Sequence, residues 1–143
     1  MVATLEGIKV LDLSQWWAVP GTGMYLADQG AEVIKVEPPG GDEARRLFTT
    51  PFLGEESKSF MVVNRNKRGM VVDITKEPGR KIIYQLVEGS DVLLENFRPG
   101  VAERLGLGYD RLSRLNPRLI QPRLRFVQKQ HLGAHDHGAG DGE

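Results

Sequence analysis

The sequence predicts an α/β protein built on an open, parallel sheet with helices packed on both faces. Short runs of aliphatic residues, such as Ile8 to Leu13, alternate with longer segments whose apolar residues recur at helical spacing. Glycine and proline mark the ends of most of these segments. A strand, a helix and a second strand follow one another within roughly thirty residues, which is typical of a βαβ unit with a right-handed crossover.

The first half of the chain supplies the first βαβ unit. Residues 8–13 are aliphatic enough for a buried strand. Pro20 can begin a helix, because the N–H it lacks would be unpaired in the first turn, and Gly30 suits the end of that helix. Residues 32–37 form the second predicted strand. The polar stretch over residues 42–64 is expected to be irregular and to cross the surface.

The second half continues the same alternation. Thr75 is predicted to cap a helix that has Pro78 in its first turn and ends at Gly89. The other predicted elements are strands over residues 70–74 and 91–96, short helices near residues 101–105 and 110–115, and a fifth strand that starts at Arg118. This alternation indicates a doubly wound sheet.

The last residues differ in character from the rest. Residues 127–143 contain all three histidines and almost no large apolar side chains. Gly133 and the glycines after it disfavour the helix that would bring these histidines together on a metal ion. We therefore predict one α/β domain over residues 1–126, a disordered or non-native tail over residues 127–143, and no metal site.

Composition excludes several classes of function. The chain has 143 residues, in which 19 Lys and Arg balance 19 Asp and Glu, so no overall positive field would hold a nucleic acid or an anionic membrane. The absence of cysteine removes disulfides, thiolate metal sites and cysteine nucleophiles. With no membrane-spanning stretch and no signal segment visible, we predict a cytoplasmic protein.

Two loops at the predicted carboxyl edge of the sheet are candidate sites, because ligands of open parallel sheets bind there. Trp16 and Trp17 follow the first strand, where two indoles could line a pocket for an adenine or an acyl group or could plug the end of the sheet as core. Arg98 follows the fourth strand and could bind phosphate, or could pair with Glu95 or Glu103.

Two further motifs carry weaker signals. Arg65, Lys67 and Arg68 in "NRNKRGMVVDI" could bind phosphates or form a solvated turn, and they precede their strand, so they reach the ligand edge only if the preceding excursion returns across it. "GTGMYL" resembles the start of a dinucleotide fingerprint, and Glu37 ends the second predicted strand, where such a fingerprint has the acid that binds the ribose. Its third glycine is missing and it lies too far from the first strand, so we expect closely packed small residues at a helix start instead of an NAD-binding oxidoreductase.

The combination of these stretches resembles the amino-terminal part of the class III CoA-transferases, a family that includes formyl-CoA and carnitine CoA-transferases and alpha-methylacyl-CoA racemases. The matching segments cover about residues 5–120 and are "LEGIKVLDLS", "LADQGAEVIKVEPPGGDEAR", "NRNKRGMVVDI" and "SDVLLENFRPGVAERLGLGYDRLSRLNPRLI". The resemblance implies a Rossmann-like open parallel sheet flanked by helices, incomplete relative to the full family fold. Residues 1–126 would then be a CoA-binding domain.

The resemblance also implies a site and an activity. Coenzyme A or acyl-CoA would be a substrate, with no permanently bound cofactor, and CoA would pass from an acyl-CoA thioester to a small carboxylic acid. The CoA site would be lined by Trp17, Ala18, Asn66, Lys67, Arg68, Asn96, Phe97, Arg98 and Arg104. Full-length members form interlocked homodimers, and no nucleic acid or membrane partner is implied.

Departures from the family pattern keep alternatives open. Trp17 stands where transferases often have a glutamine, and Pro38 where an arginine commonly follows the second strand, which leaves a racemase-type enzyme as an alternative. Family members are more than twice as long, and their catalytic aspartate lies beyond the matching region. No catalytic residue is therefore assigned, the chain alone is expected to be inactive, and a non-catalytic fragment or interaction module is the other alternative.

Overall fold

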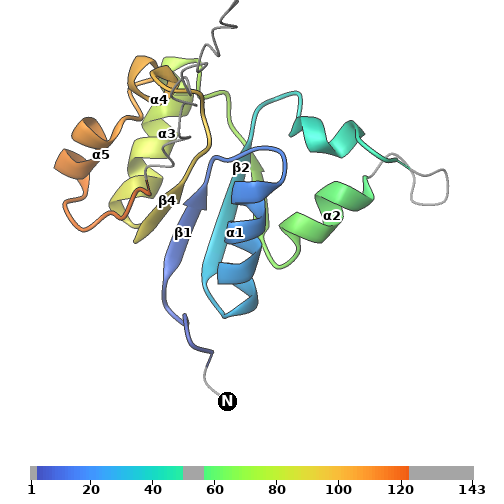
Figure 1. Cartoon of the computed structure of the whole chain (residues 1–143). Coiled ribbons are helices and arrows are strands. Elements are labelled where there is room, and N and C mark those ends of the chain that lie inside the picture. Colours follow the sequence, from blue (N-terminus) through green and yellow to red (C-terminus); the bar gives the residue numbers. More distant parts are fainter. Residues whose placement is uncertain (1–2, 50–56, 123–143) are drawn as a thin grey trace, which may run out of the picture.

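The computed structural model of the chain describes residues 3–49 and 57–122, which form one sheet with helices on both sides (Figure 1). The strands are β1 (Lys9–Asp12), β2 (Glu32–Glu37), β3 (Arg68–Val71) and β4 (Val92–Leu94). The helices are α1 (Ala18–Asp28), α2 (Lys58–Asn64), α3 (Glu77–Glu88), α4 (Val101–Arg104) and α5 (Tyr109–Leu115), together with a 3-10 helix, η1 (Glu43–Arg46). None of the helices in these two ranges is both long and apolar enough to cross a membrane.

The strands are parallel and stand in the order β3-β2-β1-β4, which confirms the predicted α/β class. The chain adds strands on one side of β1 and then crosses to its other side, so the strand order reverses between β1 and β4. In open parallel sheets such a reversal creates a crevice at the carboxyl ends of the two strands, where ligands bind. Beyond β4, Ile120 forms one parallel bridge with Val92, and the predicted fifth strand is present only as this bridge in the described chain.

Each face of the sheet has its own apolar core, because successive side chains of a strand point to opposite faces. Val10 and Val33 belong to the core that α1 covers. Leu11 and Leu93 belong to the core on the other face, together with Ile83 of α3. Figure 1 shows α1 and α2 on one side of the sheet and α3 and α5 on the other, as a doubly wound sheet requires.

The prediction of an irregular segment over residues 42–64 was wrong, because η1 and α2 lie within it. The Ser57 hydroxyl caps α2 by accepting a hydrogen bond of 3.3 Å from the Phe60 N–H. Phe60 and Val63 are buried. A helix of seven residues is too short to be stable alone or to show a helical period, so its packing, and not its sequence pattern, maintains it.

Some boundaries of strands and helices differ from the predicted ones. β3 was predicted over residues 70–74, but it begins at Arg68, because its register is fixed by pairing with Ile34 of β2. It is an edge strand, and Val71 is 64% exposed. The residue that precedes α3 is Lys76, and Thr75 instead donates its N–H to Asp73 in a turn.

Candidate functional site

The loops after β1 and β4 meet at the crevice where the strand order reverses. The Leu13 N–H donates to the Leu94 carbonyl (2.8 Å), which extends the contact between the two strands. Beyond this point, Asn96 takes over the pairing with its side chain. Its Oδ1 accepts from the Gln15 N–H (2.9 Å) and its Nδ2 donates to the Gln15 carbonyl (2.7 Å). The two loops predicted as candidate sites therefore lie side by side.

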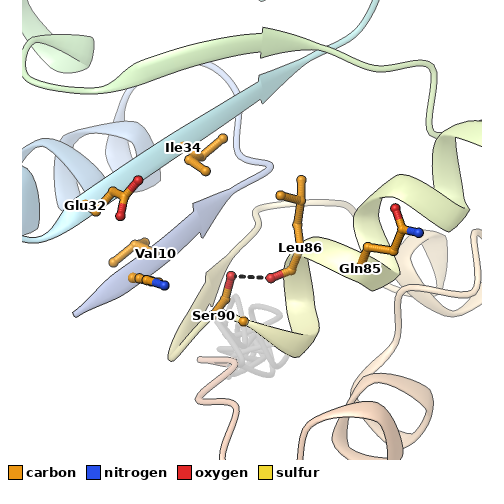
Figure 2. Close-up of a pocket in the computed structure, with 8 residues that line it drawn as sticks. Val10, Glu32, Ile34, Gln85, Leu86 and Ser90 are labelled. Carbon is orange, nitrogen blue, oxygen red and sulfur yellow. Dashed lines mark hydrogen bonds between the residues drawn. The ribbon is translucent and has the colours of Figure 1, made fainter. Parts of the chain in front are cut away.

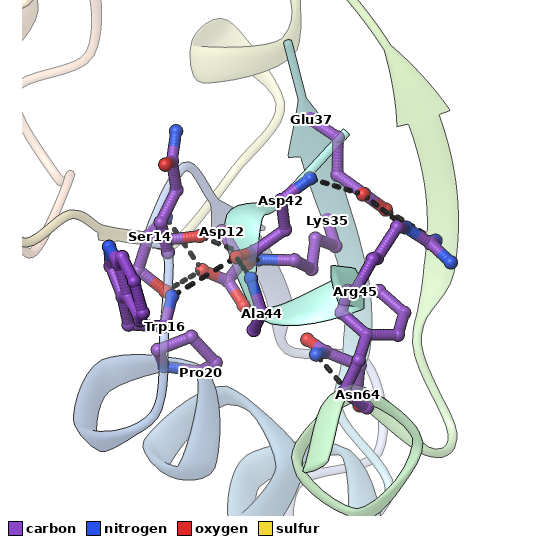
Figure 3. A network of polar contacts seen from close by, with 12 residues as sticks. Asp12, Ser14, Trp16, Pro20, Lys35, Glu37, Asp42, Ala44, Arg45 and Asn64 are labelled. Carbon is purple, nitrogen blue, oxygen red and sulfur yellow. Dashed lines mark hydrogen bonds and ion pairs between the residues drawn. The ribbon is translucent and has the colours of Figure 1, made fainter. Parts of the chain in front are cut away.

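The two tryptophans lie at this crevice with much of their surface exposed. Trp16 is 44% exposed and Trp17 is 45% exposed, so neither plugs the end of the sheet as core. Trp16 has a φ of 72°, in the left-handed region that bulky residues rarely occupy. Its N–H donates to Asp42 Oδ1 (3.2 Å), and Figure 3 shows its ring turned away from the buried polar residues. The segment presents two indoles to whatever binds at this edge.

Four charged side chains are buried beneath these loops, and Figure 3 shows three of them, Asp12, Lys35 and Asp42. Lys67 Nζ lies 2.8 Å from Asp12 Oδ2, and Lys35 Nζ lies 2.9 Å from Asp42 Oδ2; all four side chains are 2% exposed or less. Lys35 also donates to the Ser14 carbonyl (2.6 Å), so its contact with Asp42 is mainly electrostatic. Buried charges are tolerated in proteins when they are paired in this way.

Sequence reasoning missed this buried group, although the strands carry its signal. Val10 and Asp12 in β1, and Val33, Lys35 and Glu37 in β2, stand at alternate positions and therefore face the same side of the sheet. The apolar residues of that face give way to charged ones at the carboxyl ends of both strands. The period of two could have located these residues at the edge where ligands bind.

Lys67 is fully engaged inside the protein. Its ammonium donates to Asp12 Oδ2 (2.8 Å), to the Pro20 carbonyl (2.7 Å) and to Asn64 Oδ1 (2.9 Å), which uses all three of its donors. Burial lowers the pKa of Lys67 below its ordinary value, and the Asp12 carboxylate partly opposes this shift. A Cβ at residue 23 would lie 2.8 Å from Asp12 Oδ2, so Gly23 leaves the space that this ion pair occupies. Within "GTGMYL", Gly23 thus serves the expected close packing, whereas a Cβ on Gly21 would meet nothing within 4 Å.

The other cations of the predicted basic cluster lie elsewhere. Asn66 donates to Asp28 Oδ1 (2.6 Å) and Arg65 pairs with Asp28 Oδ2 (2.5 Å), at the end of α1. Arg68 pairs with Glu32 (2.8 Å), the first residue of β2. These contacts are at the amino ends of the strands, so the structure does not bring Asn66 or Arg68 together with the loops at the carboxyl edge.

The loop after β4 presents its arginine to solvent. The Glu95 carboxylate accepts from the Phe97 N–H (2.8 Å), and the Phe97 ring packs against the core beneath α3. Gly100 has a φ of 81°, a turn conformation that favours glycine, and precedes α4, which ends at Arg104. Within the described chain, the guanidinium groups of Arg98 and Arg104 make no ion pair and no hydrogen bond. The alternative in which Arg98 pairs with Glu95 or Glu103 is therefore not observed.

Glu37, the acid that would bind a ribose in the NAD interpretation, is already occupied. Arg45 donates to both of its oxygens (2.7 and 2.9 Å), and the Asp42 N–H donates to Oε2 (3.0 Å). Arg45 also stacks over the Phe60 ring at 3.7 Å from its centre. Burial acts to raise the pKa of Glu37, but the hydrogen bonds from Arg45 and Asp42 outweigh it and lower that pKa below its ordinary value. The role of Glu37 is to anchor η1.

This depressed pKa predicts a pH-dependent loss of stability in acid. A carboxyl whose pKa falls on folding stabilises the protein above its unfolded-state pKa, and that contribution is lost as pH drops through the folded-state pKa. We expect Glu37→Gln to lower the free energy of unfolding at neutral pH. The difference in unfolding free energy between wild type and variant should shrink as the pH falls below 4.5, the ordinary pKa of a glutamate carboxyl. Urea unfolding at a series of pH values measures this. Glu43→Gln, which removes an exposed carboxylate of η1, is the control. A difference in unfolding free energy between wild type and Glu37→Gln that stays constant with pH would contradict the prediction.

Hollows also lie away from these loops. One, of about 600 Å³ and widely open to solvent, is lined by Tyr109, Asp110, Leu119, Ile120 and Gln121. Another, of about 200 Å³, lies between the sheet and α3, lined by residues that include Val10, Glu32, Ile34, Leu86 and Ser90 (Figure 2). It is smaller than the roughly 300–1,000 Å³ of most ligand pockets. No group of His, Asp and Glu in residues 3–49 and 57–122 could hold a metal ion, and the predicted tail lies outside these residues.

Comparison with known proteins shows a family match and similar sequences. Residues 5–126 match the family model described as CoA-transferase family III. The chain is 44% identical over 119 residues to the succinyl-CoA:glutarate CoA-transferase of Homo sapiens, covering 83% of this chain and 27% of that protein. It is 44% identical over 115 residues to the acetyl-CoA:oxalate CoA-transferase of Acetobacter aceti, covering 80% of this chain and 29% of that protein.

Solved structures give the same result. The crystal structure of Rv3272 from Mycobacterium tuberculosis superposes with a TM-score of 0.77 at 45% identity, over 83% of this chain and 32% of that one. A CAIB/BAIF family protein from Brucella suis superposes with a TM-score of 0.78 at 39% identity, over 85% and 33% of the two chains. The chain thus spans about three tenths of the length of these relatives. On the evidence of its fold, of its sequence and of the model match over most of its length, the chain belongs to CoA-transferase family III.

Proposed function

We propose that this domain binds the coenzyme A portion of an acyl-CoA thioester, in an enzyme that transfers CoA to a second carboxylic acid. The observation that carries the proposal is that the loop of Arg98 lies beside the exposed Trp16–Trp17 segment, joined to it through Asn96 and Gln15, where the strand order reverses between β1 and β4. Within the described residues, the Arg98 guanidinium makes no ion pair and no hydrogen bond. Membership of CoA-transferase family III supports coenzyme A as the class of ligand. The relatives named above are transferases, which favours transfer over racemisation.

The charges at the crevice fit a ligand that carries phosphates. Arg98 and Arg104 each present a guanidinium group, which can make two parallel bonds to phosphate oxygens. We assign these two arginines to the phosphates. Trp17, Ala18 and Phe97 line the less polar part of the ligand.

The basic cluster contributes less directly. Lys67 has no donor left for a ligand, and Asn66 and Arg68 lie at the amino ends of the strands. We therefore place the ligand at the carboxyl edge. Lys67 acts through the buried ion pairs that support the loops there.

The transfer itself breaks one thioester bond and forms another, and releases the first acid as its carboxylate. A carboxylate nucleophile of the enzyme would first take the acyl group as an anhydride and free the CoA thiolate. The thiolate would then attack the carboxyl carbon of the enzyme, which releases the first acid as its carboxylate and leaves an enzyme–CoA thioester. The second acid would attack this thioester, and the same two steps in reverse would give the new acyl-CoA and restore the carboxylate. Asp12, Glu37, Asp42 and Glu95, which lie at or just after the carboxyl ends of β1, β2 and β4, are all engaged in ion pairs or hydrogen bonds. We infer that the reacting carboxylate lies outside the described residues. A cytoplasmic homodimer with interlocked chains, as the family resemblance implies, completes the proposal.

We expect the purified chain to bind CoA in a calorimetric titration, and to bind it at least about ten-fold more weakly when Arg98 and Arg104 are both replaced by glutamine. Each charge-assisted hydrogen bond contributes about 1.5–3 kcal/mol, so loss of two arginines gives at least this change. NAD is the control ligand, and we expect no saturable binding of it.

Two variants serve as controls for this titration. Arg114→Gln removes an exposed arginine of α5, away from the crevice, and should leave CoA affinity unchanged. Arg68→Glu tests the amino edge without disturbing the buried Lys67 and should also have little effect. No CoA binding by a folded chain would overturn the proposal and would favour an interaction domain that pairs through the exposed edge strand β3. Loss of binding only in Arg68→Glu would move the site to the amino edge.

A further inference from the structure

The backbone of Gln15 is held on both of its polar groups by one side chain. Asn96 accepts from the Gln15 N–H and donates to the Gln15 carbonyl, at 2.9 and 2.7 Å. This is the bonding pattern of a neighbouring strand, supplied by a side chain where β4 has already ended at Leu94. Each polar atom of Asn96 makes one of these bonds, so two of its four hydrogen-bonding positions hold the Gln15 backbone.

The next residue is held in an unfavourable conformation. Trp16 has a φ of 72°, and such a conformation for a bulky residue persists only where the surroundings fix it. Asn96 fixes the peptide before it, and Asp42 accepts its N–H at 3.2 Å. Asp42 is itself immobilised, because the same Oδ1 accepts from the Ala44 N–H (3.0 Å) and its Oδ2 faces Lys35.

We infer that Asn96 and Asp42 are positioning residues, which hold Trp16 in its left-handed conformation and thereby set where the Trp16 and Trp17 indoles meet the acyl part of the substrate. Together they define one device, the Asn96–Asp42 clamp. The role of the indoles toward an acyl-CoA rests on the proposed function; the role of the clamp in ordering them does not.

The exposure of the two indoles distinguishes the Asn96–Asp42 clamp from a loop held by core packing. A loop that packs as core buries its large side chains, and here the two indoles stay 44% and 45% exposed. The clamp therefore orders the segment without gaining the burial of its largest side chains. Ordered, exposed aromatic rings at a crevice are useful for contact with a ligand, since less entropy is lost when it binds.

The ordering can be measured without a ligand, because Trp16 and Trp17 are the two tryptophans of the chain. In Asn96→Ala we expect the near-ultraviolet circular dichroism of tryptophan to weaken and the fluorescence anisotropy to fall, while the far-ultraviolet spectrum stays native. Asn116→Ala is a matched control: Asn116 also holds backbone, donating to the Val87 and Ser90 carbonyls at 2.8 and 2.7 Å. It should lose comparable stability and leave both tryptophan signals unchanged.

A second variant keeps the test valid if Asn96→Ala fails to fold. Asn96→Asp retains an acceptor for the Gln15 N–H but cannot donate to the carbonyl, so both tryptophan signals should fall to intermediate values. Unchanged tryptophan signals in folded Asn96→Ala or Asn96→Asp would overturn the inference. So would equal changes in Asn116→Ala, since they would show a general loss of stability.

The ligand arm compares CoA with a medium-chain acyl-CoA by calorimetry. We expect Asn96→Ala to weaken acyl-CoA binding about five- to ten-fold and CoA binding much less. Trp16→Gly should show the same pattern, because glycine suits the left-handed φ but lacks the indole. Equal losses for both ligands would make Asn96 a general stabiliser and overturn its role in selectivity. If wild type binds neither ligand, the proposed function fails, while the spectroscopic result still decides whether the clamp orders the indoles.

Discussion

Replacing Lys67 by methionine is expected to lower the free energy of unfolding by about 3–5 kcal/mol, because it leaves the Asp12 carboxylate buried without its counter-ion. Asp12 is 0% exposed, and its remaining contacts are the N–H and the hydroxyl of Ser14. Neither of these carries a full charge. Since most domains are stable by only about 5–15 kcal/mol, the loss is a large part of the total. Chemical unfolding followed by far-ultraviolet circular dichroism measures it.

The adjacent arginine supplies the control. Arg68 pairs with Glu32, but the two side chains are 76% and 44% exposed, so Arg68→Met should cost no more than about 1 kcal/mol. The double variant Asp12→Asn with Lys67→Met removes both charges and should be more stable than Lys67→Met alone. If Lys67→Met and Arg68→Met cost the same, Lys67 is not the buried counter-ion that the structure shows.

Gly79→Ala is expected to destabilise the protein by about 3 kcal/mol, at the upper end of the usual cost of overpacking. A Cβ on residue 79 would lie 2.0 Å from the Asp73 carbonyl oxygen and 2.7 Å from its carbon. The obstacle is backbone, so no side-chain rotation relieves the clash. The first turn of α3 would have to move away from the loop after β3, which would disturb the contact of Val72 with the core.

Gly21→Ala distinguishes this clash from a general effect of replacing glycine. Gly21 lies within α1 and has open space where a Cβ would be placed, so alanine should stabilise the helix by up to about 1 kcal/mol. Thermal unfolding of both variants, compared with wild type, tests the pair. A midpoint for Gly79→Ala equal to that of wild type would show that α3 is not packed as tightly as described.

The α/β architecture was predictable because its signals are local. The apolar run of β2, the proline in the first turn of α3 and the glycine after it are each visible in sequence, and these elements lie where they were expected. α2 was missed because its seven residues depend on the Ser57 cap and on burial of Phe60. β3 was displaced because its pairing with β2, and not its own composition, sets its register.

The candidate site was predictable to a lesser extent. The Trp16–Trp17 segment and Arg98 were selected because loops after parallel strands share one edge of the sheet. β1 and β4 are neighbours in the sheet, so the loops that follow them lie side by side. Lys67 and Arg68 are neighbours in sequence, and local pattern gave no reason to separate them. Successive side chains of an extended chain point to opposite sides, so the Lys67 ammonium is buried against Asp12 while the Arg68 guanidinium is exposed beside Glu32.

By itself the sequence determined the α/β class, the order of β1 to β4 with α1 and α3, and the family, because these depend on short-range periodicity and on motifs. The tertiary structure alone decided which charges are buried and which remain free for a ligand. Asp12 and Lys67 come from distant parts of the chain, and their ion pair exists only once β1 and the turn after α2 have packed together. The left-handed conformation of Trp16 likewise depends on Asn96 and Asp42, which approach it only in the folded protein.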